Sequence, residues 1–453
     1  MISNTPPELV DWAQEPASAQ PKPKTYPLPS KAWRAFMWCV KYWIGMIFCQ
    51  SPTGAMLLIG WTYRLAQRFA IHHWWKRSSH QRNGGRFTSF LAESEATAGH
   101  IHWPNWFLSQ NFKSRRSRDE GTSQGKHAWN FFKSLTESLR QNFWTGLTGI
   151  FNTSVFILPA GLLMWFGWYD GWQNSFNKGY EEFFVGVSIS WIGIFLFIAA
   201  MFLIPMAQAR QAASGDWRAF YNFRVVWTIV RGQWFWCLAL ALGYLALASP
   251  IQVMKSAPMY LVGHPGQSEL LTPEAAKKYL ESYFFWWSIY ALPAYVILRI
   301  VAAKIYAHGL LRALTDSHLV EKDLSPFEQE TLSRLNLLHA APPVERHVGW
   351  RLVLWMGTRV GRVTSGIALF FIWFGLIAQI YLTEFLKHHV SGIGFFNQPL
   401  IQLPWIHYMP IHIEHPLTML GGLLLLILAA IVARKFWHFA TLMFTKPREL
   451  ISR

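Results

Sequence analysis

Six long apolar segments constrain this chain more than any other feature of its sequence. They cover residues 144–168, 183–205, 234–254, 284–303, 364–386 and 417–434. A helix needs about 20 mostly apolar residues to cross the hydrocarbon core of a bilayer, and each segment is close to that length. The chain is 52% hydrophobic and 14% charged, whereas soluble domains carry roughly a quarter charged residues. The sequence therefore predicts an all-α fold, a polytopic integral membrane helical bundle.

A further apolar segment near the N-terminus allows two interpretations. Residues 33–63 are interrupted by Lys41, and Ser51 followed by Pro52 is a helix-start signal, with serine as N-cap and proline in the first turn. We therefore predict two helices that meet just before Ser51. They form a re-entrant hairpin or, if residues 42–63 cross the bilayer, a seventh span. Basic residues at both ends of the segment favour the hairpin.

Lysine and arginine alternate between the two sides of the predicted spans. The loops and the tail on one side hold 30 Lys/Arg, whereas the loops on the other side hold 5. The positive-inside rule places the basic side, and with it the C-terminus, in the cytoplasm, and we expect a bacterial inner membrane. The predicted organisation is a disordered Pro-rich tail (1–32), the hairpin (33–63), a basic region (64–142), a four-span core (143–303), a helical cytoplasmic region (304–363), a two-span hairpin with an outer loop (364–434) and a basic tail (435–453).

Two regions on the basic side are predicted to contain helices. Trp129 and Phe132 belong to an apolar series at helical spacing that runs into the first of the six spans. We expect this amphipathic helix to lie on the bilayer surface, with a docking face for a soluble partner as the alternative. In the second region, Ser325 and Glu328 form a capping box and Pro326 occupies the first turn, which predicts a helix start.

The predicted spans carry almost no ionisable residues. Arg299 lies toward the cytoplasmic end of its span, where its side chain is expected to reach the headgroups, and Glu384 lies near an outer end. Ion-coupled transporters usually hold a charged residue at mid-depth, and a haem protein needs histidine inside the membrane. The chain has no Walker A loop, no GxGxxG and no HExxH, and its three cysteines match no zinc or disulfide pattern. These absences argue against an enzyme and against a haem-bearing electron carrier.

A histidine-rich stretch, PWIHYMPIHIEHP at 404–416, is expected on the outer side between the last two spans. His412, Glu414 and His415 carry groups that bind zinc or a similar divalent metal. Their spacing matches no standard site, and a complete site would need the histidines at 388–389. We therefore favour an ordered outer cap and keep a divalent-metal site as the alternative.

One cytoplasmic segment has a distinct composition. In residues 204–232, Pro205 is expected to end a span, and the Ala-rich residues that follow it are expected to be helical. Gly215 and Asp216 are then expected to restart a helix that carries several aromatic residues. Four arginines are expected on its cytoplasmic face, namely Arg210, Arg218, Arg224 and Arg231. Arginines at this level contact anionic lipid headgroups or a partner protein.

Three observations favour a non-catalytic role: the spans lack buried charge, the cytoplasmic loops are large, basic and aromatic, and catalytic motifs are missing. We expect a membrane subunit or scaffold that holds other membrane or cytoplasmic proteins at the cytoplasmic face. The net charge of +17 is explained by the basic loops, so no nucleic-acid partner is expected. The alternatives are a permease or channel for a neutral or anionic solute, and a metal-dependent envelope enzyme that uses the outer histidine loop.

Overall fold

The computed structural model describes a defined subset of the chain. The described residues are 31–82, 84–87, 89–91, 104–105, 108–109, 124–168, 183–262, 273–338, 348–386, 395–396 and 400–402. The chain divides into two units, Met1–Trp43 and Ile44–Arg453. In the first unit the described part is the beginning of one helix. The second unit holds every other element and all of the sites discussed below.

The described residues are almost entirely helical. The α-helices are α1 (Lys31–Phe48), α2 (Pro52–Arg77), α3 (Ser79–Arg82), α6 (Gln124–Trp168), α8 (Phe183–Ser214), α9 (Phe223–Gly232), α10 (Trp234–Val262), α11 (Pro273–Thr315), α12 (Pro326–Arg334) and α13 (Val348–Leu386). Two 3-10 helices, η3 (Trp217–Tyr221) and η4 (Glu321–Asp323), and a two-residue antiparallel ladder of β1 (Pro104–Asn105) and β2 (Leu108–Ser109) complete the elements. The predicted all-helical fold is confirmed.

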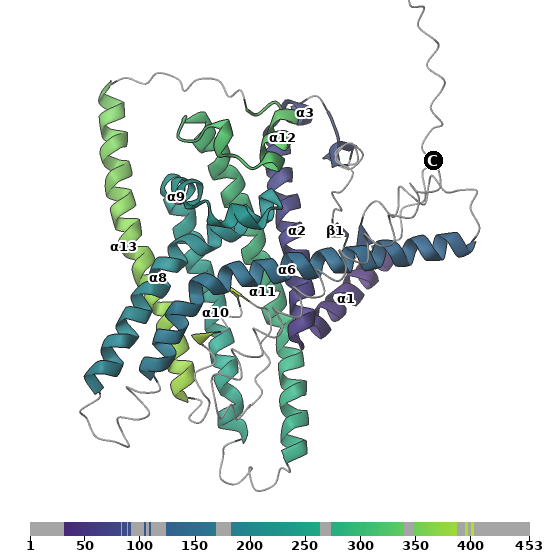
Figure 1. Cartoon of the computed structure of the whole chain (residues 1–453), viewed down its shortest axis with the longest axis vertical. Coiled ribbons are helices and arrows are strands. Elements are labelled where there is room, and N and C mark those ends of the chain that lie inside the picture. Colours follow the sequence, from purple (N-terminus) through teal and green to yellow (C-terminus); the bar gives the residue numbers. More distant parts are fainter. Residues whose placement is uncertain are drawn as a thin grey trace, which may run out of the picture. The chain divides into compact units, whose positions relative to one another are not determined.

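Five of the helices are long and apolar enough to cross a membrane, which marks the chain as an integral membrane protein. Their candidate spans are Leu135–Trp168, Val185–Ser214, Trp234–Ala257, Glu281–Thr315 and Met356–Phe385. They confirm five of the six predicted spans, and the sixth, 417–434, lies outside the described residues. In Figure 1 α8, α10, α11 and α13 run alternately in opposite directions, and α6 lies across them. The helices α9 and α12 and the C-terminal end of α11 share one end of the second unit.

The start of α2 follows the predicted signal. The Ser51 side chain accepts a hydrogen bond from the Gly54 backbone N–H (3.1 Å), and Pro52 occupies the first turn, where its missing N–H costs nothing. The preceding helix α1 ends at Phe48, so the predicted break between two helices is confirmed.

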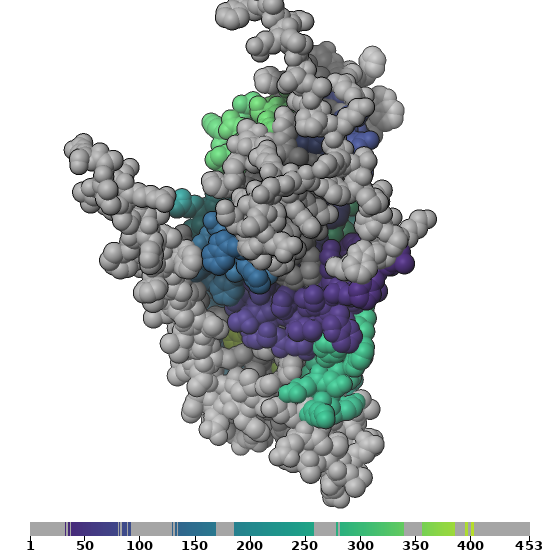
Figure 2. All heavy atoms as spheres, turned by 90° about the vertical axis from the view of Figure 1, so that its right-hand side faces the viewer, coloured from purple at the N-terminus to yellow at the C-terminus, as the bar shows by residue number. Residues whose placement is uncertain are grey.

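Helix α2 runs parallel to α11 and begins part of the way along it. Gln50 lies against Ser288 (Nε2 to Oγ, 3.4 Å), and Trp74 donates from its ring N–H to the Ala307 carbonyl (3.1 Å). In Figure 2 the green surface of α11 continues beyond the level at which purple α2 begins. The turn before α2 therefore lies beside the apolar span of α11, which is the placement expected for a re-entrant hairpin. The number of spans beyond five stays a prediction.

Two glycines let α2 cross α6 with the backbones in direct contact. A Cβ atom at Gly60 would lie 1.7 Å from the Asn142 carbonyl oxygen, and one at Gly146 would lie 1.9 Å from the Met56 carbonyl oxygen. No side chain fits at either position, which is the usual role of small residues where membrane helices cross. Arg64 of α2 adds hydrogen bonds to Ser138 and to Asn142 (2.7 Å) of α6.

The helix predicted after Pro205 is present, but α8 runs without a break from Phe183 to Ser214, so the proline lies inside the helix of the span and does not end it. The residues after Pro205 are buried, as Met206, Ala207, Ala209 and Ala213 show. Their packing against neighbouring helices stabilises the helical path even though proline removes one helical hydrogen bond. At α12, by contrast, the predicted capping box is present, with the Glu328 carboxylate accepting from the Ser325 N–H (2.9 Å).

Candidate functional site

Arg299 is buried inside the bundle. The sequence predicted that its side chain reaches the headgroups, and this prediction is wrong, because the residue is only 5% exposed. It lies within the apolar span of α11 and points toward α2 and α8. Its guanidinium lies over the ring of Tyr295 at 4.8 Å and near the ring of Tyr63 at 5.7 Å from the centroids. Aromatic faces attract a cation, so two rings partly replace its lost hydration.

Polar side chains of α6 and α8 complete the surroundings of Arg299. The Arg299 guanidinium donates to the Gln208 side-chain oxygen, and the Gln208 amide donates to the Thr153 hydroxyl (2.7 Å). Thr153 in turn donates to the Gly149 carbonyl within its own helix (2.8 Å). We call Arg299, Gln208, Thr153 and the tyrosines at 63, 244 and 295 the Arg299 cluster.

A short piece of non-helical backbone enters the same cluster. The Ile401 carbonyl accepts hydrogen bonds from Arg299 Nη2 (2.6 Å) and from Gln208 Nε2 (3.0 Å). Gln402 lies beside Ser154 of α6 (Nε2 to Oγ, 3.4 Å), and Phe395 packs on Tyr381 with ring centroids 4.7 Å apart. This part of the loop between α13 and the last predicted span is therefore buried among helices. Irregular backbone at membrane depth is tolerated only in such a protein-lined position.

The Arg299 cluster holds a positive charge without a negative counterpart among the described residues. Arg299 has no ion pair with a carboxylate there, and its Nε has no hydrogen-bond partner in the same part of the chain. The Tyr244 hydroxyl is also buried and lacks a hydrogen-bond partner within the described ranges. An unpaired buried cation costs several kcal/mol even after relaxation, so a site of this kind is suited to an anion.

A second polar group joins α6 to η3, one residue away from Thr153. The Asn152 amide donates to the Gln211 side chain (3.1 Å) and to the Trp217 carbonyl (2.9 Å), while Tyr221 donates to the Asn152 oxygen (2.9 Å). Each polar atom of the Asn152 side chain is thus satisfied. These bonds hold η3 against the bundle, and η3 begins at the predicted restart, with Asp216 as its N-cap.

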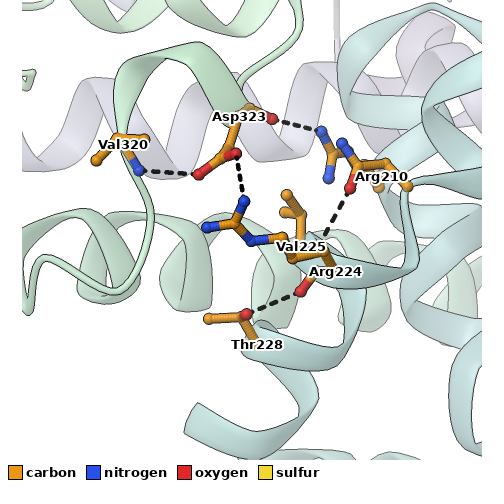
Figure 3. A network of polar contacts seen from close by, with 7 residues as sticks. Arg210, Arg224, Val225, Thr228, Val320 and Asp323 are labelled. Atoms are coloured by element: carbon orange, nitrogen blue, oxygen red, sulfur yellow. Dashed lines mark hydrogen bonds and ion pairs between the residues drawn. The ribbon is translucent and has the colours of Figure 1, made fainter.

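Two of the four arginines predicted as surface contacts hold the connection between α11 and α12. Arg210 is 2% exposed, so it does not belong to the exposed face predicted for it, and it donates to the Asp323 carbonyl (2.8 Å). Arg224 approaches the Asp323 carboxylate (3.6 Å), which also accepts from the Val320 N–H (3.2 Å). Figure 3 shows both guanidinium groups converging on Asp323. Arg210 therefore connects α8 to the segment between α11 and α12.

The other predicted contact residues, Arg218 and Arg231, are exposed, and their role stays a prediction. The predicted metal ligands His412, Glu414 and His415 lie outside the described residues. Within the described ranges no group of three His, Cys, Asp or Glu side chains could hold a metal ion.

A histidine pair lies between the C-terminal ends of α2 and α11. The rings of His73 and His308 meet edge to face with centroids 5.8 Å apart, and His73 Nε2 is buried without a hydrogen-bond partner among the described residues. Burial lowers the pKa of His73 to about 4, and the charges of Arg77, His308, Lys304 and Lys76 act in the same direction.

Acidification is expected to destabilise the protein through His73. The pKa in the folded state lies below the unfolded value of 6.5, so protonation favours the unfolded chain. The stability that neutral His73 contributes is fully present above about pH 6.5 and is lost as the pH falls toward 4. Thermal unfolding in detergent across this range measures the effect. His73→Gln should flatten the profile, whereas the exposed His318→Gln should keep it; equal profiles for His73→Gln and wild type would contradict the assignment.

Sequence reasoning missed the Arg299 cluster because no local sequence motif indicates it. Its members come from α2, α6, α8, α10 and α11, the 400–402 turn contacts them, and only the assembled bundle brings these parts together. One signal was present: an arginine within an apolar span is rare enough to be a functional hypothesis by itself. Comparison of this chain with protein-family models, with curated proteins and with solved structures finds no match.

Proposed function

We propose that this protein is a membrane permease for a small anionic solute, with the Arg299 cluster as the point at which the anion binds. The supporting observation is the buried guanidinium of Arg299, which has no carboxylate partner in the described part of the chain. A positive charge is retained inside an apolar bundle at a cost in stability. A transported anion that neutralises this charge during each cycle gives a physical reason for its presence.

The backbone that meets Arg299 supports the same proposal. Transport proteins place irregular backbone next to their substrate sites, where carbonyl and N–H groups can exchange partners. The Ile401 carbonyl accepts hydrogen bonds from Arg299 Nη2 and Gln208 Nε2, which are the two donors that an anion would use. Displacement of the 400–402 turn would free both donors for the solute.

Orientation and localisation form part of the proposal. The ends of α9 and α11 and the start of α13 lie at one end of the second unit, and this end carries the lysine- and arginine-rich loops. The positive-inside rule supports a cytoplasmic location for this end, in a bacterial inner membrane. Epitope tags at Ser325 and at Gly171, probed in intact and permeabilised cells, should report opposite compartments.

Proteoliposomes test the transport proposal directly. Purified protein in vesicles loaded with potassium chloride, potassium acetate or potassium phosphate is diluted into a medium without the salt, and valinomycin is added so that potassium can follow the anion. We expect faster vesicle shrinkage, measured by light scattering, than in protein-free vesicles for at least one of the three salts. Glycerol serves as the neutral probe. If the vesicles responded to glycerol alone, the transported solute would be neutral and not an anion. No response to any probe would contradict a permease.

The scaffold predicted from the sequence becomes the second candidate, because one of its premises, spans without buried charge, does not hold at Arg299. One observation favours it. Trp217 and Trp227 are exposed on η3 and α9, next to the exposed Arg218 and Arg224. Exposed aromatic and arginine side chains are enriched at protein interfaces. Affinity purification in mild detergent that recovers a stoichiometric partner, and loses it in the Trp227→Ser variant, would support the scaffold.

The metal-dependent envelope enzyme remains a hypothesis about residues outside the described ranges. It needs His412, Glu414 and a third ligand to converge at about 2.0–2.2 Å from one metal ion. Metal analysis of the purified protein tests it, and protein without bound zinc or a similar metal after zinc loading and desalting would contradict it.

A further inference from the structure

One edge of the Arg299 guanidinium is only half satisfied. Its Nη2 donates to the Ile401 carbonyl oxygen (2.6 Å), whereas its Nε is buried and has no hydrogen-bond partner among the described residues. In a planar guanidinium Nε and Nη2 each direct an N–H bond to the same side, and this pair of donors matches the two oxygens of a carboxylate. A backbone carbonyl has a single oxygen, so Ile401 meets one of these donors and leaves the other unmet.

The remaining contacts of Arg299 come from helices. Nη1 donates to the side-chain oxygen of Gln208 on α8, and the guanidinium carbon lies 4.8 Å from the centroid of the Tyr295 ring on α11. Ile401, by contrast, belongs to a turn, and irregular backbone can exchange its hydrogen-bond partners more readily than a packed helix can. The edge formed by Nε and Nη2 is therefore the edge at which a solute would replace the protein's own acceptor.

The charge of the site limits the charge of the solute. The described side chains that contact Arg299 are those of Gln208, Tyr63 and Tyr295, and none of them is ionised at neutral pH. A monovalent anion neutralises a single guanidinium. A divalent anion such as sulfate would leave a second charge buried without a partner, which is strongly unfavourable.

The turn that meets Arg299 also buries apolar side chains. Leu400 and Ile401 are 3% and 2% exposed, so both are packed within the bundle. When the turn withdraws, a carbonyl oxygen and apolar groups leave the bundle together. A solute of similar volume that combines an oxygen acceptor with a small apolar group refills this space best. Chloride and nitrate match the charge of the site but carry no apolar group.

We propose that the solute is a short monocarboxylate, whose two oxygens accept hydrogen bonds from Arg299 Nε and Nη2 and whose apolar substituent takes the place of the Leu400 and Ile401 side chains. This inference rests on the proposed function, because it names the solute of the same site. Gln208 Nε2, which donates to the Ile401 carbonyl, supplies a third donor to the carboxylate. Arg299 then determines specificity, since its planar edge distinguishes a carboxylate from a spherical anion.

A series of anions tests the inference on the purified full-length protein. Thermal unfolding in neutral detergent is measured at constant ionic strength against butyrate, acetate, nitrate, chloride and phosphate, and flux is measured with the corresponding potassium salts and valinomycin. Decanoate represents a carboxylate that enters from the lipid phase. We expect butyrate to half-saturate the stabilisation at a concentration about tenfold below that of chloride, since one more charge-assisted hydrogen bond is worth about that factor.

Arg299→Lys tests the role of the planar edge. Lysine keeps the positive charge but lacks the paired donors, so the butyrate-to-chloride preference should fall from about tenfold to about one. The matched control is Arg218→Gln, which removes an arginine from η3, outside the Arg299 cluster, and should keep the preference of the wild type. The order of the anions in the wild-type protein tests the inference independently of any variant.

The possible outcomes separate the solute from the transport function. If the wild-type protein responded equally to butyrate and chloride, or more strongly to nitrate or phosphate, the monocarboxylate would be overturned and the permease would stand. A preference for decanoate over butyrate would also overturn it, because the carboxylate would then come from the lipid phase. Saturable butyrate binding without flux would contradict the permease alone and would leave a carboxylate-binding site at Arg299.

Discussion

Gly60→Ala is expected to lower the stability of the protein by about 3 kcal/mol, the upper part of the range for overpacked cores. The new methyl group would lie 1.7 Å from the Asn142 carbonyl oxygen, and ordinary van der Waals contacts begin at 3.4 Å. The clash is between backbone and methyl group, so no side-chain rotation can relieve it, and α2 must move away from α6. That movement also breaks the hydrogen bonds of Arg64 to Ser138 and Asn142. The midpoint of thermal unfolding in detergent measures the loss.

Gly366→Ala is the matched control for this prediction. Gly366 lies in the apolar span of α13, and a Cβ atom there would meet nothing within 4 Å among the described residues. The same substitution should leave stability unchanged or raise it slightly, because alanine is the better helix former. If Gly60→Ala and Gly366→Ala behaved alike, the close crossing of α2 and α6 would be disproved.

Arg299→Met should abolish anion flux through proteoliposomes while changing stability by no more than about 2 kcal/mol. Two opposing effects determine the stability. The substitution removes hydrogen bonds from a charged donor to Gln208 and Ile401, each worth roughly 1.5–3 kcal/mol. It also removes an unpaired buried cation, whose desolvation costs several kcal/mol, and a buried methionine is tolerated in the same volume. Flux is lost because methionine offers an anion neither charge nor donor.

Measuring both anion flux and thermal stability distinguishes a binding role of Arg299 from a structural role. If Arg299 only satisfied the Ile401 carbonyl, the methionine variant would unfold at a much lower temperature and any remaining folded protein would still carry flux. Arg299→Lys is a useful second variant, since it keeps the charge but loses the planar fork that reaches both Gln208 and Ile401. We expect reduced flux from the lysine variant rather than none.

The helices of this chain could be predicted from the sequence because their signals are local. Five apolar segments, the Ser51 N-cap and the Ser325–Glu328 capping box depend only on neighbouring residues, and each is present in the structure. The end of the span was placed too early, at Pro205, because a local rule was applied where tertiary packing decides. Helix α8 continues through the proline since the residues that follow it are buried against other helices.

The candidate site could not be predicted, because its geometry depends on contacts between distant parts of the chain. An arginine near the end of an apolar span can reach the headgroups or turn inward, and the sequence around Arg299 is compatible with both. The inward orientation follows from Gln208 and Ile401, which are 91 and 102 residues away. The glycines of the α2–α6 crossing gave no signal either, since the pairing of Gly60 with Asn142 is set by the assembled helices.

The position of Ile401 in the chain, after the helices that it contacts, has a consequence for biogenesis. During translation, α2, α6, α8 and α11 leave the ribosome well before the residue whose carbonyl meets Arg299 and Gln208. The nascent bundle must therefore hold a guanidinium whose final acceptor has not yet been synthesised. Truncated or stalled chains that stop before Ile401 should be preferred substrates of membrane quality-control proteases. In such chains the Arg299 guanidinium lies inside the membrane without its Ile401 acceptor.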